Sequence, residues 1–297
     1  MHSQSIFITK VSSSEEKDAV LLLIDSIRSF GGEMGECPFW IFGTDPQVEY
    51  LQGLSLDQVE IYSLSVPVLL QHYPFGDKVI ACAKAEAQTP LGIHSLIWLD
   101  PECLIIQPPL LYDLEEDFDA AFRPVHLRNV GLSPDEPLNA FWKGIYRVLG
   151  VQDIQRPVNS FVDQQCLRAY FNSHGFSIRP QLGLMNRWQE LFEQLVYDRQ
   201  YQEIACKERR NQIFLFQALL SALITSALDE QRIRILPPQY NYPYNLQAQI
   251  GDARRVGTLN DLVSLTYEER PLDPKLVTDL DIREPLRAWL ETHLSTG

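Results

Sequence analysis

The stretch HSLIWLDPECLIIQPP, residues 94–109, is the most hydrophobic strand-like part of the chain, yet it carries two carboxylates in its middle. The apolar run 97–99 is followed by Asp100, Pro101 and Glu102 before the apolar pattern resumes. A short apolar run bounded by turn residues predicts a buried strand. The neighbouring segments must decide whether the two acids form a turn or a site.

The chain before this stretch alternates between strand and helix patterns. Ser12 or Ser13, each followed three residues later by Glu, resembles a helix capping box, and Gly31-Gly32 is typical of a helix end. Residues 75–88 (FGDKVIACAKAEAQ) predict another helix, rich in alanine. The strand-like segments are 5–9 (SIFIT), 38–43 (PFWIFG), 58–64 (QVEIYSL) and the run that ends at Leu99.

This alternation predicts an α/β fold with a mostly parallel, Rossmann-like central sheet flanked by helices. Ligands of such sheets bind at the carboxyl ends of the strands, which is where Asp100 is expected. With 297 residues, 45% of them hydrophobic, the chain can bury the core of one large domain. We therefore expect a single compact unit with its site beside Asp100.

The composition limits the possible partners. A formal net charge of -14 disfavours a nucleic acid or an anionic membrane, because the field of the protein repels both. The five cysteines are odd in number and form no metal-spaced pair, which favours reduced thiols in a cytoplasmic protein. The N-terminus lacks the pattern of a secretory signal. The longest apolar region, 213–228, is interrupted by polar residues and predicts a buried helix, so we expect no transmembrane segment.

The acids Asp100 and Glu102 permit two interpretations. In an extended chain, Asp-x-Glu places both carboxylates on one side, because side chains alternate with a period of two. Two such ligands, completed by water and phosphate oxygens, can hold Mg²⁺ or Mn²⁺ against a diphosphate. Alternatively, Asp100-Pro101-Glu102 is a turn between two strands, in which the aspartate accepts backbone hydrogen bonds.

The strand IWLDPE, preceded by an alanine-rich helix that bears lysines, resembles the GT-A fold of nucleotide-diphospho-sugar glycosyltransferases. The resemblance covers about residues 5–245, and D-P-E stands where those enzymes carry D-x-D. It implies a nucleotide-sugar donor, an acceptor, and Mn²⁺ or Mg²⁺ held by Asp100 and Glu102. It also divides the single domain, 1–297, into a nucleotide-binding half (about 1–110), an acceptor half (about 111–250) and a C-terminal extension (251–297). Within that extension, the charged composition of the residues after Asp261 favours a mostly surface position.

The same resemblance implies a set of donor-binding residues. Thr9 and Lys10 lie where GT-A proteins hold the nucleobase and ribose, and Lys78 and Lys84 match a basic residue that approaches the donor. Asn172 belongs to YFNSHG, which is similar to an F-N-x-G segment that lines the sugar pocket. The complete implied set is Thr9, Lys10, Lys78, Lys84, Trp98, Asp100, Arg123, Asn172, Tyr240 and Asn241, the last two from LPPQYNYPYN (236–245).

Two departures from the family pattern concern catalysis. His174 occupies the usual glycine position of F-N-x-G, where it narrows the pocket, supports another site residue or acts as a catalytic group. Phe216 replaces the acid of an Asp-Gln or Glu-Gln helix start. This protein has therefore either lost that acid or supplies a catalytic base from Asp163, Glu208 or another loop. Whether the anomeric configuration is retained or inverted stays open. A retaining enzyme of this fold often has a late metal-binding histidine, and the only histidine after His174 is His293.

The loop RPVHLRNVG is a further candidate site. It supplies Arg123, His126, Arg128 and Asn129, a cluster that fits a phosphate or an acceptor, because arginine forks match phosphate and carboxylate oxygens. The alternative is that these side chains bond to neighbouring loops.

Three functions remain in competition. The first is a metal-dependent glycosyltransferase that uses a UDP- or GDP-sugar. The second is a GT-A-like nucleotide-binding or scaffold protein that has lost turnover, which the Phe216 and His174 departures favour. The third is a nucleotidyltransferase, which ranks last because residues 8–18 (ITKVSSSEEKD) lack the glycine-rich loop that holds a triphosphate.

Overall fold

A seven-stranded, mostly parallel sheet forms the centre of the molecule. The computed structural model describes residues 4–54, 56–154, 156–268, 270, 272, 277 and 280–294. Its strand order is β10-β6-β9-β4-β1-β2-β3, and β9 is the antiparallel member between β4 and β6. The strands are β1 (Ser5–Val11), β2 (Phe39–Gly43), β3 (Val59–Ser63), β4 (Ser95–Leu99), β6 (Ala120–Phe122), β9 (Gly175–Ile178) and β10 (Ile233–Ile235).

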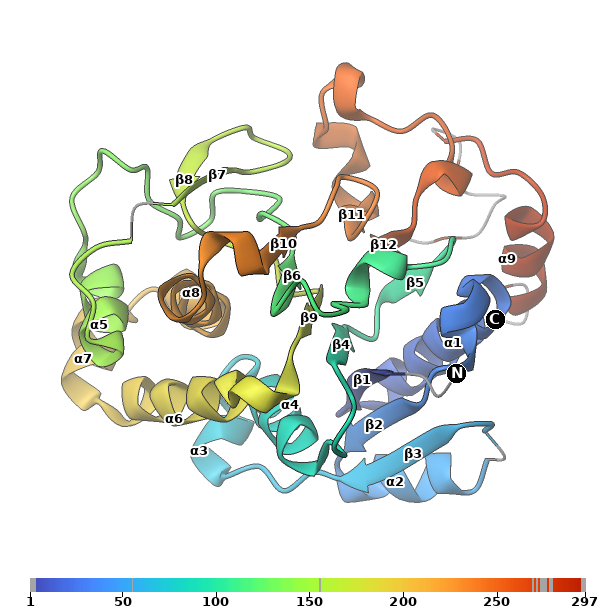
Figure 1. The fold of residues 1–297 in the computed structure, drawn as a ribbon, viewed down its shortest axis with the longest axis horizontal. Coiled ribbons are helices and arrows are strands. Elements are labelled where there is room, and N and C mark those ends of the chain that lie inside the picture. Colours follow the sequence, from blue (N-terminus) through green and yellow to red (C-terminus); the bar gives the residue numbers. More distant parts are fainter. Residues whose placement is uncertain are drawn as a thin grey trace.

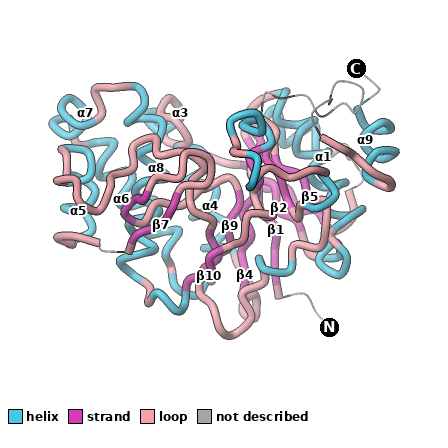
Figure 2. The backbone as a smooth tube through the Cα atoms, turned by 90° about the horizontal axis from the view of Figure 1, so that it is seen from above, coloured by secondary structure: helices cyan, strands magenta, loops and turns pink. Residues whose placement is uncertain are grey.

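Helices cover both faces of this sheet (Figures 1 and 2). One face carries α4 (Gly76–Gln88), α5 (Ala140–Leu149), α6 (Leu184–Tyr197) and α8 (Arg209–Ala227), and the other carries α1 (Ser14–Phe30). The predicted α/β architecture is therefore confirmed. The remaining helices are α2 (Asp45–Gln52), α3 (Val68–Gln71), α7 (Arg199–Ala205) and α9 (Leu286–Leu294).

The two-residue period of the strands decides which helices each side chain meets. In β4, Leu96 and Trp98 join the core under α4 and α6, whereas Ile97 and Leu99 join the core under α1. All four are fully buried. Asp100 continues the series of Leu96 and Trp98, so its side chain points toward α4.

Residues 94–109 form two strands in two different sheets. After β4, β5 (Cys103–Ile105) pairs with β12 (Ser264–Thr266), which also pairs with β11 (Tyr242–Pro243). The backbone N–H of Cys103 donates to the Asp100 carbonyl over 3.0 Å, which closes a turn between the strands. The expectation of an extended Asp-x-Glu was therefore wrong, and the turn interpretation describes the backbone.

The C-terminal part of the chain contributes to the core. The residues after Asp261 were expected to be mostly surface, but Leu262 and all of β12 are buried. A third small sheet pairs β7 (Pro157–Asn159) with β8 (Cys166–Arg168). The apolar region 213–228 forms most of the buried helix α8, and among the described residues no helix is long and apolar enough to cross a membrane. None of the five cysteines, all of which lie in the described part of the chain, forms a disulfide, and four of them are buried.

The start of α4 depends on a glycine. A Cβ added at Gly76 would lie 2.3 Å from the backbone carbonyl oxygen of Leu70, which cannot move without shifting α3. We expect Gly76→Ala to lower the free energy of unfolding by about 2 kcal/mol, measured by urea denaturation. Gly257→Ala is the control, because a Cβ there meets open space. Equal stabilities of the two variants would contradict this packing argument.

Candidate functional site

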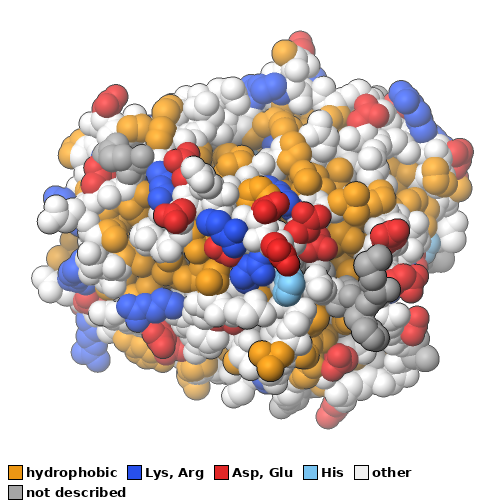
Figure 3. All heavy atoms as spheres, viewed as in Figure 1, with side chains coloured by type: hydrophobic (Ala, Val, Ile, Leu, Met, Phe, Trp, Pro, Cys, Tyr) orange, Lys and Arg blue, Asp and Glu red, His pale blue; other side chains and the backbone are white. Residues whose placement is uncertain are grey.

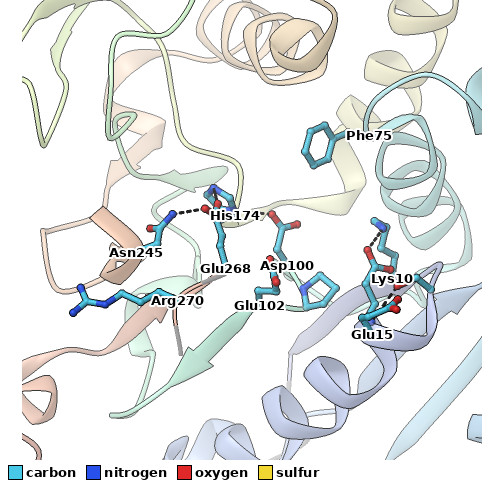
Figure 4. A pocket seen from close by; sticks show the side chains of 12 residues that line it. Lys10, Glu15, Phe75, Asp100, Glu102, His174, Asn245, Glu268 and Arg270 are labelled. Atoms are coloured by element: carbon cyan, nitrogen blue, oxygen red, sulfur yellow. Dashed lines mark hydrogen bonds and ion pairs between the residues drawn. The ribbon is translucent and has the colours of Figure 1, made fainter. Parts of the chain in front are cut away.

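A cavity of about 730 Å³ opens at the carboxyl ends of β1 and β4 (Figures 3 and 4). In the space-filling view, acidic side chains gather beside a histidine near the middle of the face, with basic side chains next to them (Figure 3). The cavity thus lies where a parallel sheet is expected to bind its ligand. Its lining residues are Lys10, Ser13, Glu15, Glu16, Phe75, Asp100, Pro101, Glu102, His174, Asn245, Glu268 and Arg270.

A buried lysine binds the carboxylate of Asp100 from the side of α4. Lys78 on α4 is fully buried, and its Nζ donates to Asp100 Oδ1 and to the carbonyl oxygen of Ser173, each over 2.7 Å. Trp98 Nε1 donates to the same aspartate oxygen over 2.7 Å. Burial alone would raise the pKa of Asp100, but the charge of Lys78 and the hydrogen bond from His174 outweigh it and lower that pKa. Asp100 is therefore an ionised carboxylate with a fixed orientation.

His174 links two carboxylates across the cavity (Figure 4). Its Nδ1 lies 2.9 Å from Asp100 Oδ2, and its Nε2 lies 3.3 Å from Glu268 Oε1. Asn245 Nδ2 donates to the other oxygen of Glu268. Strand β9 runs antiparallel to β4, and its first residue, Gly175, pairs with Leu99 at the end of β4. His174, which precedes Gly175, therefore lies next to Asp100, which follows Leu99.

The charge of the cavity is strongly acidic. Burial raises the pKa of Glu102, and the negative charges of Glu268 and Asp100 raise it further. Carboxylate oxygens are the ligands that Mg²⁺ and Mn²⁺ prefer. Across the part of the chain that the structure describes, no group of three or more His, Cys, Asp or Glu side chains is placed so that it could by itself hold a metal ion. The acidic lining residues are Glu15, Glu16, Asp100, Glu102 and Glu268, and the basic ones are Lys10 and Arg270.

Lys10 joins the end of β1 to the starts of α1 and α4. Its Nζ lies 2.7 Å from Glu16 and 2.8 Å from Asp77, and Ser12 Oγ donates to the same Asp77 oxygen over 2.6 Å. Asp77 also accepts the backbone N–H of Lys78. Burial would raise the pKa of Asp77, but the ammonium of Lys10 lowers it below its usual value. This network sets the wall of the cavity opposite His174.

A second cavity of about 210 Å³ adjoins the first. The two share His174, Asn245 and Glu268, so these side chains form a common wall. The second cavity is lined by Val125, His126, Leu127, Asn129, Asn172, His174, Phe214, Gln217, Asn245, Leu246, Thr266 and Glu268.

Seven of the sequence-derived candidates line one or both cavities. Lys10, Asp100 and Glu102 line the larger one, His126, Asn129 and Asn172 the smaller one, and His174 both. They come from separate parts of the chain, and the carboxyl edge of the central sheet brings them together.

Three other candidates lie in the core behind the site. Thr9 is buried and its hydroxyl donates to the Leu99 carbonyl over 2.7 Å. Trp98 and Lys78 are fully buried and hold Asp100, as described above. The contacts of Lys78 and Trp98 position the aspartate, and none of the three residues lines either of the two cavities.

Arg123, Tyr240 and Asn241 form a buried support for Asn172. Arg123 Nη1 donates to the carbonyl oxygens of Tyr240 and Asn241, each over 2.7 Å. Asn241 Nδ2 donates to Asn172 Oδ1 over 3.1 Å. These three also lie outside both cavities, so their contacts orient a lining residue.

The remaining candidates face other parts of the molecule. Lys84 donates to the Ser63 carbonyl at the end of β3. Asp163 accepts the backbone N–H of Arg128 over 2.9 Å and lies in the loop between β7 and β8. Glu208 is exposed at the start of α8. None of these three lines either of the two cavities.

Sequence reasoning missed several lining residues. Phe75 stacks on Phe216 of α8, at the position where the family pattern carries an acid, with ring centroids 4.3 Å apart. Asn245 lies in the quoted segment 236–245 and could have been found there. Glu268 and Arg270 follow β12 in an unremarkable charged stretch, so no local pattern distinguishes them.

Removing the cation behind Asp100 is expected to destabilise the fold. Lys78→Met leaves a buried carboxylate without its counterion, which costs about 3 kcal/mol of unfolding free energy. Urea denaturation measures this loss, and adding Asp100→Asn is expected to recover part of it. Lys84→Met, the same change on the same helix, is the control and should cost under about 1 kcal/mol. Similar losses in both lysine variants would argue against the buried pair.

Asp77 predicts a pH dependence of stability. Because its pKa is lowered in the folded state, the unfolded chain takes up the proton first as the pH falls. The contribution of Asp77 is therefore complete above its unfolded pKa of about 3.9 and is lost as the pH drops below that value. Below pH 4, we expect the free energy of unfolding of Asp77→Asn to fall less steeply than that of the wild type. The two slopes should differ by up to about 1.4 kcal/mol per pH unit.

Urea denaturation at pH 6, 4, 3.5 and 3 measures this difference in slope. Asp252→Asn controls for the loss of one surface charge, since the Asp252 side chain is 96% exposed. Parallel pH profiles for the wild type and Asp77→Asn would show that the contact with Lys10 does not stabilise the fold.

Comparisons with known proteins agree with this architecture. No curated protein matches the sequence. The solved structure of the galactosyltransferase LgtC with donor and acceptor sugar analogues superposes with a TM-score of 0.51 at 12% identity, covering 98% of this chain and 94% of that one. The bifunctional glycosyltransferase WbbM gives a TM-score of 0.55 at 10% identity, covering 90% of this chain and 46% of that one. These likenesses show the GT-A fold. Residues 13–227 match the Rhodobacterales glycosyltransferase domain, and the chain therefore belongs to that glycosyltransferase family.

Proposed function

We propose that the protein transfers a sugar from a UDP- or GDP-sugar to an acceptor hydroxyl in the larger cavity. The observation that carries this proposal is the fixed carboxylate of Asp100, which faces a cavity with Glu102 and Glu268 at the carboxyl end of β4. The position of this cavity supports a nucleotide site, since ligands of α/β sheets bind outside the carboxyl ends of the strands.

The electrostatics of the cavity support a role for a divalent cation. A diphosphate cannot approach clustered carboxylates without one, and Lys10 is already paired with Glu16 and Asp77. Asp100 and Glu102 would hold Mn²⁺ or Mg²⁺. The bound cation would offset the charge of the leaving diphosphate. Lys78 keeps Asp100 ionised and oriented for this role.

Glu268 is the best-placed residue to accept the proton of the acceptor hydroxyl. It lies in the wall shared by the two cavities, whereas Asp163 and Glu208 lie outside both. Asn245 and His174 contact its two oxygens and fix its direction. In this arrangement His174 positions both Asp100 and Glu268, and an attacking hydroxyl would reach Glu268 from the smaller cavity.

A second function has support of its own. Both oxygens of Asp100 are engaged by protein groups, and Phe216 is apolar where the family pattern carries an acid. These features favour a nucleotide-binding protein without turnover. Such a protein would bind nucleotide regardless of metal and leave a nucleotide sugar intact.

Calorimetric titration of UDP and GDP, with and without Mn²⁺, tests the proposal. Glu102→Gln is the informative variant, because replacing Asp100 would also leave Lys78 unpaired. We expect Mn²⁺ to strengthen nucleotide binding to the wild type, and Glu102→Gln to weaken binding in Mn²⁺ at least tenfold. Glu203→Gln, an exposed change on α7, is the control.

The rate at which UDP or GDP is released from the corresponding nucleotide sugars is then measured for the wild type, Glu102→Gln and Glu203→Gln. Metal-independent binding without any release would favour the inactive binding protein. Failure of both nucleotides to bind under every condition would reject the proposed function.

A further inference from the structure

The smaller cavity contains a buried histidine that the proposed reaction does not use. His126 is 8% exposed and lines only this cavity. Neither of its ring nitrogens has a hydrogen-bond partner among the described residues. Its ring stacks with that of His174, with centroids 6.2 Å apart and an interplanar angle of 12°. Buried polar atoms without hydrogen-bond partners cost free energy. A hydrogen-bonding group that enters the cavity would remove this cost by pairing with the nitrogens of His126.

The surroundings of His126 favour its neutral form. Burial lowers its pKa well below the usual value, and the charges of Arg123 and His174 lower it further. A neutral imidazole has one nitrogen that donates and one that accepts a hydrogen bond. A hydroxyl can serve either nitrogen, because it both donates and accepts.

Neither arginine of the same loop lines the smaller cavity, which argues against a phosphate site there. Arg123 donates to buried backbone carbonyls, and Arg128 pairs with Glu136 over 2.7 Å. Among the described residues that line the smaller cavity there is no lysine or arginine. An anion would meet the carboxylate of Glu268 without a compensating cation.

The other lining groups match a sugar. Amides line the cavity at Asn129, Asn172, Gln217 and Asn245, and these groups donate to and accept from hydroxyls. The apolar side chains of the cavity can pack against the faces of a sugar ring from which its C–H groups project. These apolar residues are Val125, Leu127, Phe214 and Leu246.

We propose that the smaller cavity is a subsite for a neutral, hydroxyl-rich pyranose ring and that His126 hydrogen-bonds one of its hydroxyls. The assignment of this ring as a substrate rests on the proposed function. The ring belongs either to the sugar of the donor or to the acceptor, and both present the same chemistry. Because Glu268 lies in the shared wall, a ring bound here is adjacent to the larger cavity.

The direct test measures sugar binding to the full chain without nucleotide. The probes are methyl glucosides, galactosides and mannosides, followed by saturation-transfer NMR, with inorganic phosphate as a competitor. His126→Phe keeps a flat ring but removes both nitrogens, and we expect it to weaken binding of the preferred glycoside at least fivefold. His126→Gln keeps one donor and one acceptor and should restore most of the affinity.

A second variant guards against a folding defect in His126→Phe. Leu246→Trp fills the smaller cavity from its partly buried rim, and it should abolish glycoside binding while UDP and GDP titrations stay within twofold of the wild type. Unchanged glycoside affinity in both His126→Phe and Leu246→Trp would overturn the proposal. Displacement of the glycosides by phosphate would also overturn it.

Kinetics distinguish the two sources of the ring. If the ring belongs to the donor, His126→Phe should lower the affinity for the nucleotide sugar relative to the free nucleotide. If it belongs to the acceptor, the variant should raise the KM for the acceptor alone. The glycoside measurement needs no nucleotide, so failure of the nucleotide titrations rejects the proposed function without deciding this subsite.

Discussion

The site depends on the buried ion pair between Lys78 and Asp100. A fully buried ammonium is tolerated only with a charged partner and additional hydrogen bonds, and Lys78 has both through Asp100 and the Ser173 carbonyl. The pair ties α4 to the end of β4 and to the segment before β9. Asp100 therefore stays ionised and immobile in a cavity that already holds several carboxylates.

The two cavities are joined by the wall of His174, Asn245 and Glu268. The larger cavity is charged and lies over the ends of β1 and β4, whereas the smaller one is lined by amides, imidazoles and apolar groups. This division separates a charged region from a largely uncharged one, and Glu268 lies at the boundary between them. In the proposed reaction the nucleotide diphosphate would bind in the charged region.

Much of the fold could be predicted because its signals are local. The capping serine before α1, the alanine-rich pattern of α4 and the apolar run of β4 each depend on neighbouring residues. Asp100 could be singled out for the same reason. The backbone of D-P-E was harder to predict, because an apolar run on both sides is compatible with one strand or with two strands in different sheets. The burial of Lys78 could not be predicted from the sequence either. Lys78 was therefore expected to face the donor, although it lies behind Asp100.

The sequence by itself determined the order of strands and helices and the presence of acids at the end of the central strand. Periodicity specifies which face of a strand is buried, but it does not specify which strands are neighbours. Only the tertiary structure inserted β9 antiparallel beside β4, which brings His174 to Asp100. Only the pairing of β12 with β5 brings Glu268 into the cavity wall. Both pairings join segments far apart in the chain, and the cooperative burial of the whole core, rather than any local pattern, selects them.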